Sequence, residues 1–239
     1  DVISRYGEEG SEARLDKLGG VAWQARKAKL KERIREMADQ LIAIAAARQL
    51  KAGEVFEPQA GTYDAFCAGF SFQETEDQLR SIDDVIRDLS AGRPMDRLVC
   101  GDVGFGKTEV ALRASFVAAM EGQQVAVVVP TTLLARQHFR VFSQRFEDFP
   151  VRVAQLSRLV SQKDVNTTKV GLEDGTVDIV IGTHALLGKD IQFQRLGLLI
   201  IDEEQHFGVA HKENLKQLKT NVHVLTLTAT PIPRTLQMA

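Results

Sequence analysis

A glycine-rich segment at residues 101–108 constrains the fold of this chain more than any other feature. It has the pattern G-x-x-x-x-G-K-T, follows a short apolar run and precedes a stretch with helical periodicity. Glycines let a backbone curl so that its N–H groups point inward, and the start of a helix adds partial positive charge. A strand, such a loop and a helix in this order predict a phosphate-binding loop in an α/β domain.

The chemistry of such a loop assigns a role to each of its positions. Lys107 is expected to reach the β- and γ-phosphates of a nucleotide, and the Thr108 hydroxyl is expected to bind Mg²⁺. The predicted cofactors are therefore ATP and Mg²⁺. The nucleotide-binding candidates in the loop are Gly101, Asp102, Val103, Gly104, Phe105, Gly106, Lys107 and Thr108.

The chain from about residue 73 onward alternates helix-like and strand-like segments. Helical patterns occupy residues 74–90 and 107–121. Short, continuously apolar strands between helices predict a parallel sheet with helices on both faces. Strands are predicted at residues 98–100, 125–129, 151–156, 178–181, 198–201 and 222–227.

An acidic segment follows the predicted strand at 198–201 and reads Asp202, Glu203, Glu204, Gln205. In isolation an acidic run is most often a solvated turn. After a buried strand, and in a chain with a phosphate loop, it is the expected second half of an ATPase site. Asp202 is then predicted to hold Mg²⁺, and Glu203 to orient and deprotonate the attacking water.

Thr228, Ala229 and Thr230 end the next predicted strand. The threonine hydroxyls are in a position to hydrogen-bond to the acidic segment and to respond to the nucleotide. The alternative is an ordinary threonine-rich turn.

The first part of the chain is predicted to be a long helix at residues 21–50, after a short strand-like piece at 2–6. Leu30, Ile34, Met37, Leu41 and Ile44 fall on one face of that helix. Its many basic residues fit either a solvated face or a contact with nucleic acid or an acidic partner. Residues 53–72 contain glycine and proline and are predicted to form a loop-like linker.

Composition limits the possible functions. The 30 basic and 32 acidic residues give a net charge of −2. This charge argues against a general polyanion binder, so any contact with nucleic acid must come from local basic patches.

No apolar run reaches the ~18 residues of a membrane helix. The cysteines, Cys67 and Cys100, form no CxxC pair; Cys100 is expected to be a buried free thiol, and a cytoplasmic location fits best. The N-terminus has no signal-peptide layout. It also lacks an initiator Met, and the chain stops abruptly at Ala239, so it is expected to be a piece of a longer protein.

Together these segments resemble the superfamily 2 helicases and translocases. Residues 101–108, 202–205 and 228–230 are similar to motifs I, II and III of that superfamily, and residues 130–135 to motif Ia. Residues 181–184 resemble the next DNA-contacting loop. The resemblance implies a RecA-like sheet and ATP hydrolysis coupled to movement along double-stranded DNA.

Longer segments resemble one family within this superfamily, the transcription-repair coupling factors. Residues 94–109 and 228–236 carry this likeness, and Phe105 stands where the related RecG helicases usually have Ser. Residues 15–23 are similar to the segment that joins the polymerase-interacting domain of the coupling factors to their motor. The resemblance implies the end of that domain and a linker helix at 1–52, a linker at 53–72, and the first RecA-like lobe at 73–239, truncated at its C-terminus.

The same resemblance implies partners and further site residues. The partners are double-stranded DNA, RNA polymerase, nucleotide excision repair proteins and a second RecA-like lobe, with no membrane. Gln78 is implied to read adenine, and Phe70 to stack on it. The implied contacts to the DNA backbone are Thr131, Thr132, Arg158, Thr183 and His184.

Two departures from the family pattern place individual roles in question. His206 stands where the family commonly has Arg, and Leu159 and Val160 replace a more aromatic and basic continuation after Arg158. Two alternative functions stay open: a RecG-like helicase acting on branched DNA, and a non-catalytic interaction module with a degenerate ATPase fold.

Overall fold

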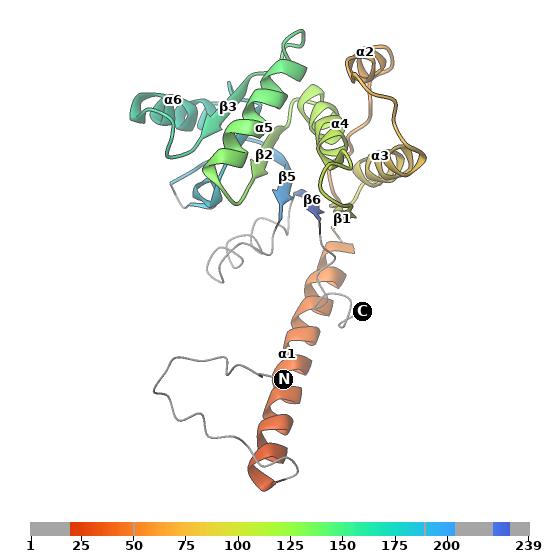
Figure 1. The fold of residues 1–239 in the computed structure, drawn as a ribbon, viewed down its shortest axis with the longest axis vertical. Helices are drawn as coiled ribbons and strands as arrows, with labels where there is room; N and C mark the ends of the chain where they lie inside the picture. Colours follow the sequence, from red (N-terminus) through yellow and green to blue (C-terminus); the bar gives the residue numbers. More distant parts are fainter. Residues whose placement is uncertain (1–19, 50, 189, 204–221, 230–239) are drawn as a thin grey trace, which may run out of the picture. The chain divides into compact units, whose positions relative to one another are not determined.

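The computed structural model describes residues 20–49, 51–188, 190–203 and 222–229 (Figure 1). Contacts divide the chain into two compact units, one up to Ala45 and one from Ala46. The predicted strand-like piece at 2–6 lies outside the described residues.

Helix α1 (Val21–Gln49) confirms the long helix predicted at 21–50. Leu30 and Ile34, on its predicted apolar face, are exposed in this chain. Its basic residues Lys27, Lys29 and Lys31 are exposed as well. Both interpretations of the basic residues therefore stay open.

The second unit is built on a six-stranded sheet with the order β1-β6-β5-β2-β4-β3. All five strand pairs are parallel. The predicted strands and the α/β class are thereby confirmed. The strands are β1 (Asp96–Cys100), β2 (Gln124–Val128), β3 (Val153–Leu156), β4 (Ile179–Gly182), β5 (Leu196–Asp202) and β6 (His223–Thr228).

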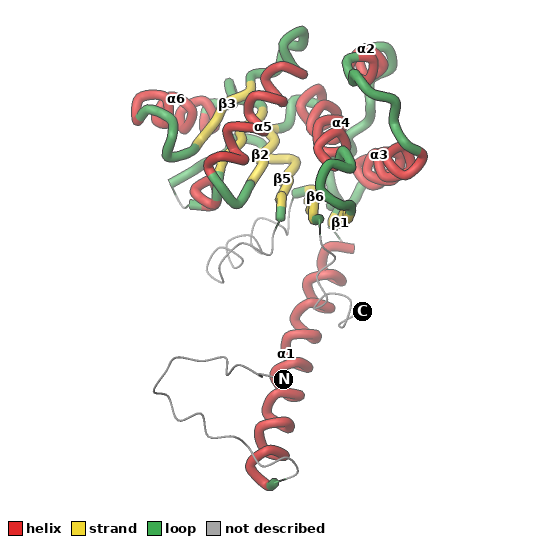
Figure 2. Tube along the Cα trace, viewed as in Figure 1, coloured by secondary structure: helices red, strands yellow, loops and turns green. Residues whose placement is uncertain are grey.

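Alternate residues along the strands face two separate hydrophobic clusters. Val125 and Val127 of β2 belong to one cluster, whereas Ala126 and Val128 belong to the other. The first face is covered by α2 (Thr62–Ala68), α3 (Glu76–Leu89), α4 (Lys107–Met120) and α5 (Thr132–Arg145). The second is covered by α6 (Gln162–Glu173) and the 3₁₀ helix η1 (His184–Leu187). Helices therefore lie on both faces, as predicted (Figure 2).

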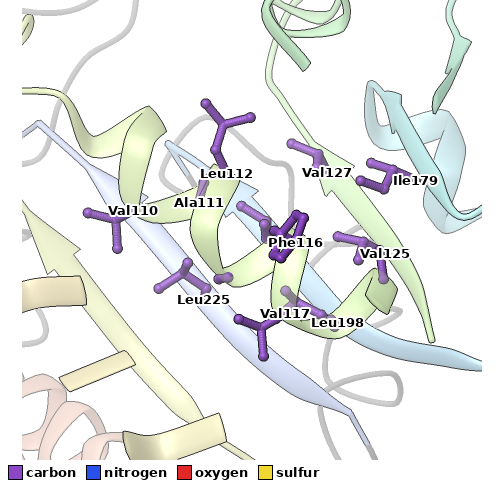
Figure 3. Close-up of a cluster of buried hydrophobic side chains, with 14 of the residues drawn as sticks. Val110, Ala111, Leu112, Phe116, Val117, Val125, Val127, Ile179, Leu198 and Leu225 are labelled. Atoms are coloured by element: carbon purple, nitrogen blue, oxygen red, sulfur yellow. The ribbon is translucent and has the colours of Figure 1, made fainter. Parts of the chain in front are cut away.

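Helix α4, which starts at the phosphate loop, is the most deeply buried of the helices that the structure describes. Its residues Val110, Phe116 and Val117 pack against strand residues that include Leu198 and Leu225 (Figure 3). Burying each such side chain stabilises the fold by about 1.5–3 kcal/mol. The burial holds the start of α4 in one position at the sheet edge.

The segment at 53–72 differs from the predicted loop-like linker. It contains helix α2, and both Phe56 and Phe66 are buried in the core. The ring of Phe66 stacks on Phe116 of α4 with a centroid distance of 4.3 Å. Aromatic burial against α4 thus outweighs the local effect of the glycines and proline. The division of the chain into domains at residues 52 and 72 stays a prediction.

One further expectation from the sequence is wrong. Cys100 is exposed rather than buried, because β1 is an edge strand and Cys100 alternates with the buried Val99. Both cysteines are free thiols, as expected for Cys100. Within the described ranges, no helix is long and apolar enough to cross a membrane.

Candidate nucleotide and nucleic-acid sites

The strand order brings the predicted ATPase residues to one place. β6 lies between β1 and β5, and Cys100 pairs with Thr228 while Asp202 pairs with Leu227. The backbone N–H of Gly101 donates to the carbonyl of Thr228 at 3.1 Å. The phosphate loop, the acidic segment and the threonine turn therefore share the carboxyl edge of three adjacent strands. Ligands of open α/β sheets bind at this edge.

The phosphate loop has the backbone geometry that its glycines predict. Gly104 and Gly106 have φ values of 89° and 74°, which favour glycine. Gly106 is the N-cap of α4, so the positive end of that helix faces the loop. The Lys107 ammonium group donates to the carbonyl oxygen of Asp102 at 3.0 Å and to that of Gly101. The lysine thus points into its own loop, where phosphate oxygens are its expected acceptors.

Gln78 lies directly against this loop. Its amide nitrogen donates to the carbonyl of Phe105 at 2.8 Å, and its amide oxygen accepts from the Thr75 backbone N–H at 2.9 Å. With the Thr75 hydroxyl, the second bond forms a capping box at the start of α3. A glutamine amide has two donor hydrogens and two acceptor lone pairs, so one of each stays available to an adenine edge.

Phe70 lines a cavity of about 740 Å³ that also borders the loop. Phe66, Gly106, Thr108 and Arg145 contribute to its wall. Gln78 lines a different cavity of about 560 Å³, together with Phe105 and Lys107. The two residues implied to bind adenine are thus both beside the loop, but the structure gives them separate cavities. Their roles remain predictions.

A buried ion network braces the first turn of α4, and the sequence patterns did not reveal it. One carboxylate oxygen of Glu109 accepts from Arg113 Nε and from Arg145 Nη2, each at 2.9 Å. Arg113 also pairs with Glu74, and the Arg145 guanidinium carbon lies 4.6 Å from the centroid of the Phe66 ring. Burial raises the pKa of Glu109, and both guanidinium groups oppose that shift. The partners lie 36 residues or more apart in two of the pairs, so no local pattern predicts them.

Glu203 is held in a specific orientation. One carboxylate oxygen accepts from the Thr228 hydroxyl at 3.2 Å, and the other from the backbone N–H of Ala229 at 2.8 Å. Its own N–H donates to the carbonyl of Leu227 at 2.9 Å. Among the described residues, Glu203 alone of the non-glycine residues has a positive φ, 55°. Such strain concentrates at functional sites, and the contact predicted between the threonine hydroxyls and the acidic segment is confirmed for Thr228.

The described residues do not include the second half of the acidic segment, Glu204 and Gln205, or Thr230 of the threonine turn. His206, which follows the acidic segment, also lies outside them.

Asp202 ends β5 and has a neighbour that no sequence pattern indicated. Nε2 of His138 on α5 lies 3.3 Å from the Asp202 carboxylate, and both side chains are largely buried. The only sequence signal for His138 is a polar residue on the buried side of an amphipathic helix, which is too common to identify a site.

The residues at this edge fit a magnesium-bound nucleotide. The predicted metal residues, Thr108 and Asp202, offer a hydroxyl and a carboxylate, which are ligands that Mg²⁺ accepts while keeping phosphate and water oxygens. In the described ranges no group of three or more His, Cys, Asp or Glu residues is arranged to hold a metal.

The candidate DNA-contacting residues follow the other three strands. Thr131 comes after β2, Arg158 after β3, and Thr183 and His184 after β4, and these strands are neighbours in the sheet. Arg158, Thr183 and His184 line one cavity of about 640 Å³ with Lys169. Arg158 is exposed, whereas Thr183 is buried.

At the same edge, Thr131 caps α5 by accepting from the Leu134 N–H at 3.2 Å, and Thr132 is the first residue of that helix. The structure thus brings the candidates to one edge of the sheet. Their contact with DNA remains a prediction.

Fold and site together define a P-loop ATP-binding lobe of the RecA-like type. The sequence from 75 to 239 matches the DEAD/DEAH box helicase family, and the chain belongs to that family.

Individual relatives narrow the comparison. The chain is 54% identical over 240 residues to the transcription-repair-coupling factor of Bacillus subtilis (strain 168), covering 100% of this chain and 20% of that protein. It is 56% identical over 243 residues to that of Rickettsia bellii (strain RML369-C), covering 100% of this chain and 22% of that protein. The resemblance to the coupling factors is thereby confirmed, and the chain spans about a fifth of their length.

Among solved structures, the chain is similar to RecG bound to a three-way DNA junction. The TM-score is 0.73 at 33% identity, covering 91% of this chain and 30% of that one. This similarity confirms the RecA-like architecture.

Proposed function

We propose that the chain is the ATP-binding lobe of a double-stranded DNA translocase that displaces stalled RNA polymerase and promotes transcription-coupled nucleotide excision repair. The observation that carries the proposal is the similarity to the coupling factors at 54% identity over the whole chain, with the phosphate loop and Glu203 brought to one edge of the sheet. The proposed partners are double-stranded DNA, RNA polymerase, excision repair proteins and a second RecA-like lobe, in the cytoplasm.

The proposed reaction is ATP + H₂O → ADP + phosphate, with each step assigned to a residue. Lys107 exchanges the carbonyls of Gly101 and Asp102 for the β- and γ-phosphate oxygens. Thr108 and Asp202 would hold Mg²⁺, and the ion would neutralise charge on the phosphates. Glu203 accepts a proton from the attacking water. The hydrogen bonds from the Thr228 hydroxyl and the Ala229 N–H keep its carboxylate oriented during this transfer.

The 239-residue chain on its own is proposed to hydrolyse ATP poorly. In motors of this kind an arginine finger from a second lobe stabilises the transferred phosphoryl group, and such a residue contributes about 10³–10⁵-fold in rate. A DNA-stimulated turnover of about 1 s⁻¹ or more from this chain alone, within the range of complete enzymes, would contradict that proposal.

The test uses the protein that carries this chain together with its second lobe. Lys107→Ala is compared with Arg87→Ala, which removes a cation from an exposed ion pair on α3. We expect Lys107→Ala to lower DNA-stimulated ATP hydrolysis by at least about 100-fold, the scale on which such electrostatic contacts act, and to abolish release of RNA polymerase stalled on DNA. Arg87→Ala should behave like the wild type. Polymerase release by Lys107→Ala at the wild-type rate would support a non-catalytic module instead.

A second candidate function, remodelling of branched DNA, is favoured by the likeness to RecG on a DNA junction. It is tested with the same proteins on a three-way junction that carries no polymerase. ATP-dependent unwinding of the junction without polymerase release would select this candidate over the first.

A further inference from the structure

His138 is the protein group that contacts the carboxylate of Asp202 from the side of α5. Its Nε2 atom lies 3.3 Å from the nearer Asp202 oxygen, and the two side chains are 10% and 14% exposed. Little water reaches either group. A contact between a ring nitrogen and a carboxylate is stronger in such surroundings than at an open surface.

The burial of the other ring nitrogen, Nδ1, indicates that a histidine occupies this position because of its contact with Asp202. Nδ1 is buried and has no hydrogen-bond partner among the described residues. An unpaired buried nitrogen destabilises a fold, and an apolar side chain would avoid that cost. Since a carboxylate oxygen carries no proton to donate, the Asp202 contact is favourable when Nε2 carries the hydrogen.

Helix α5 connects this contact to the candidate DNA-binding edge. Thr131 caps the helix and Thr132 begins it. His138 follows Thr132 by roughly 9 Å along the helix axis, at about 1.5 Å per residue. The continuous backbone hydrogen bonds of the helix join Thr132 and His138 into one rigid segment. A shift of the helix start therefore moves His138 as well.

We propose that His138 is a positioning residue that transmits DNA binding at the start of α5 to Asp202, the residue assigned to Mg²⁺. Bound DNA holds Thr131 and Thr132, α5 holds His138, and His138 fixes the carboxylate in the orientation that accepts the metal. The proposal rests on the proposed function. Outer contacts of this kind typically change metal affinity by about 10–100-fold when removed.

The test uses three variants of the protein that carries this chain and its second lobe. His138→Leu removes the contact and keeps an apolar volume, and His138→Asn provides an amide too short to reach Asp202. His138→Gln has an amide nitrogen at a reach similar to that of Nε2 and serves as the conservative rescue. The readout is equilibrium binding of a fluorescent ADP analogue over a MgCl₂ series and without Mg²⁺, each with and without duplex DNA, after circular dichroism has confirmed folding.

For the wild type we expect DNA to lower the MgCl₂ concentration at half-maximal binding. In His138→Leu and His138→Asn that concentration should rise about 10-fold or more and lose its dependence on DNA, while Mg²⁺-free binding is unchanged. His138→Gln should restore both within about threefold. A merely structural role would weaken binding with and without Mg²⁺ alike.

Several outcomes would overturn the proposal. Unchanged Mg²⁺ midpoints in both removing variants would exclude the contact as a metal-positioning device. Folding of His138→Gln but of neither removing variant would assign His138 to stability alone. A wild-type protein that binds no nucleotide at any Mg²⁺ concentration would instead reject the proposed function, which keeps the two failures distinguishable.

Discussion

The hydroxyl of Thr228, the last residue of β6, donates a hydrogen bond of 3.2 Å to the carboxylate of Glu203, the residue directly after β5. The two residues lie 25 positions apart in the sequence but next to each other where two adjacent parallel strands end. Together with the N–H of Ala229, the hydroxyl occupies both oxygens of the proposed general base. This contact links the threonine turn to the water-activating position.

Removing that hydroxyl should slow hydrolysis while leaving nucleotide binding intact. Thr228→Val keeps the side-chain volume but removes the hydroxyl that donates to Glu203, so we expect ATP turnover to fall about 10-fold or more. The fluorescent-nucleotide Kd should change by less than about twofold, because no phosphate contact is lost. Thr228→Ser should retain turnover. Thr226→Val, which removes a buried hydroxyl from the same strand, is the matched control; an equal loss in both variants would rule out a specific role for the Glu203 contact.

Gln78 should determine the preference for adenine. Gln78→Ala removes both the free amide positions and the bond to the Phe105 carbonyl. We expect the ratio of GTP to ATP dissociation constants to fall by about 10-fold, since one or two hydrogen bonds of about 0.5–1.5 kcal/mol each are lost. The measurement is competition against a fluorescent adenine nucleotide.

Thr75→Ala is the control for Gln78, because it weakens the same capping box without removing the amide. It should cost about 1 kcal/mol of stability and leave base selectivity unchanged. Retention of full ATP preference by Gln78→Ala would show that the glutamine serves only the cap of α3 and the bond to the Phe105 carbonyl.

The network around Glu109 should be a major contributor to stability. Glu109→Ala leaves the Arg113 and Arg145 guanidinium groups without their shared carboxylate in a buried site. Breaking a buried pair in this way costs about 3–5 kcal/mol, measured as the free energy of unfolding in urea. Arg87→Ala breaks an exposed pair with Asp84 and should cost less than about 1 kcal/mol. Similar losses in both variants would mean that the network is no stronger than a surface pair.

The two cysteines should react at different rates, and only one should respond to nucleotide. Cys100 is exposed and lines the cavity beside Gly101 and Lys107. Cys67 is half-buried, and burial raises the pKa of its thiol, so it carries less of the reactive thiolate near neutral pH. We expect a maleimide to label Cys100 first, and MgATP to slow that labelling, as followed by mass spectrometry of the tryptic peptides. Cys67 should be unaffected; equal protection of both would point to a global change instead.

Most of the architecture could be predicted because its signals are local. Short apolar runs between helical patterns indicated every strand of the sheet within a few residues. The glycine pattern at 101–108 specified a loop whose Gly104 and Gly106 have the expected positive φ. The same reasoning failed for residues 53–72, since burial of Phe56 and Phe66 depends on surfaces contributed by distant segments. The prediction that Cys100 is buried failed because no local sequence pattern indicates that β1 is an edge strand.

The phosphate loop, the acidic segment and the alternation of helix and strand can be predicted from the sequence, since each depends on the identity and spacing of neighbouring residues. Packing of the whole domain sets β6 between β1 and β5, and so brings Thr228 to Glu203. It alone placed His138 beside Asp202, and Glu109 between two arginines. The physical reason is that strand order and side-chain pairing minimise the free energy of the whole packed domain, and no short stretch of sequence encodes that minimum.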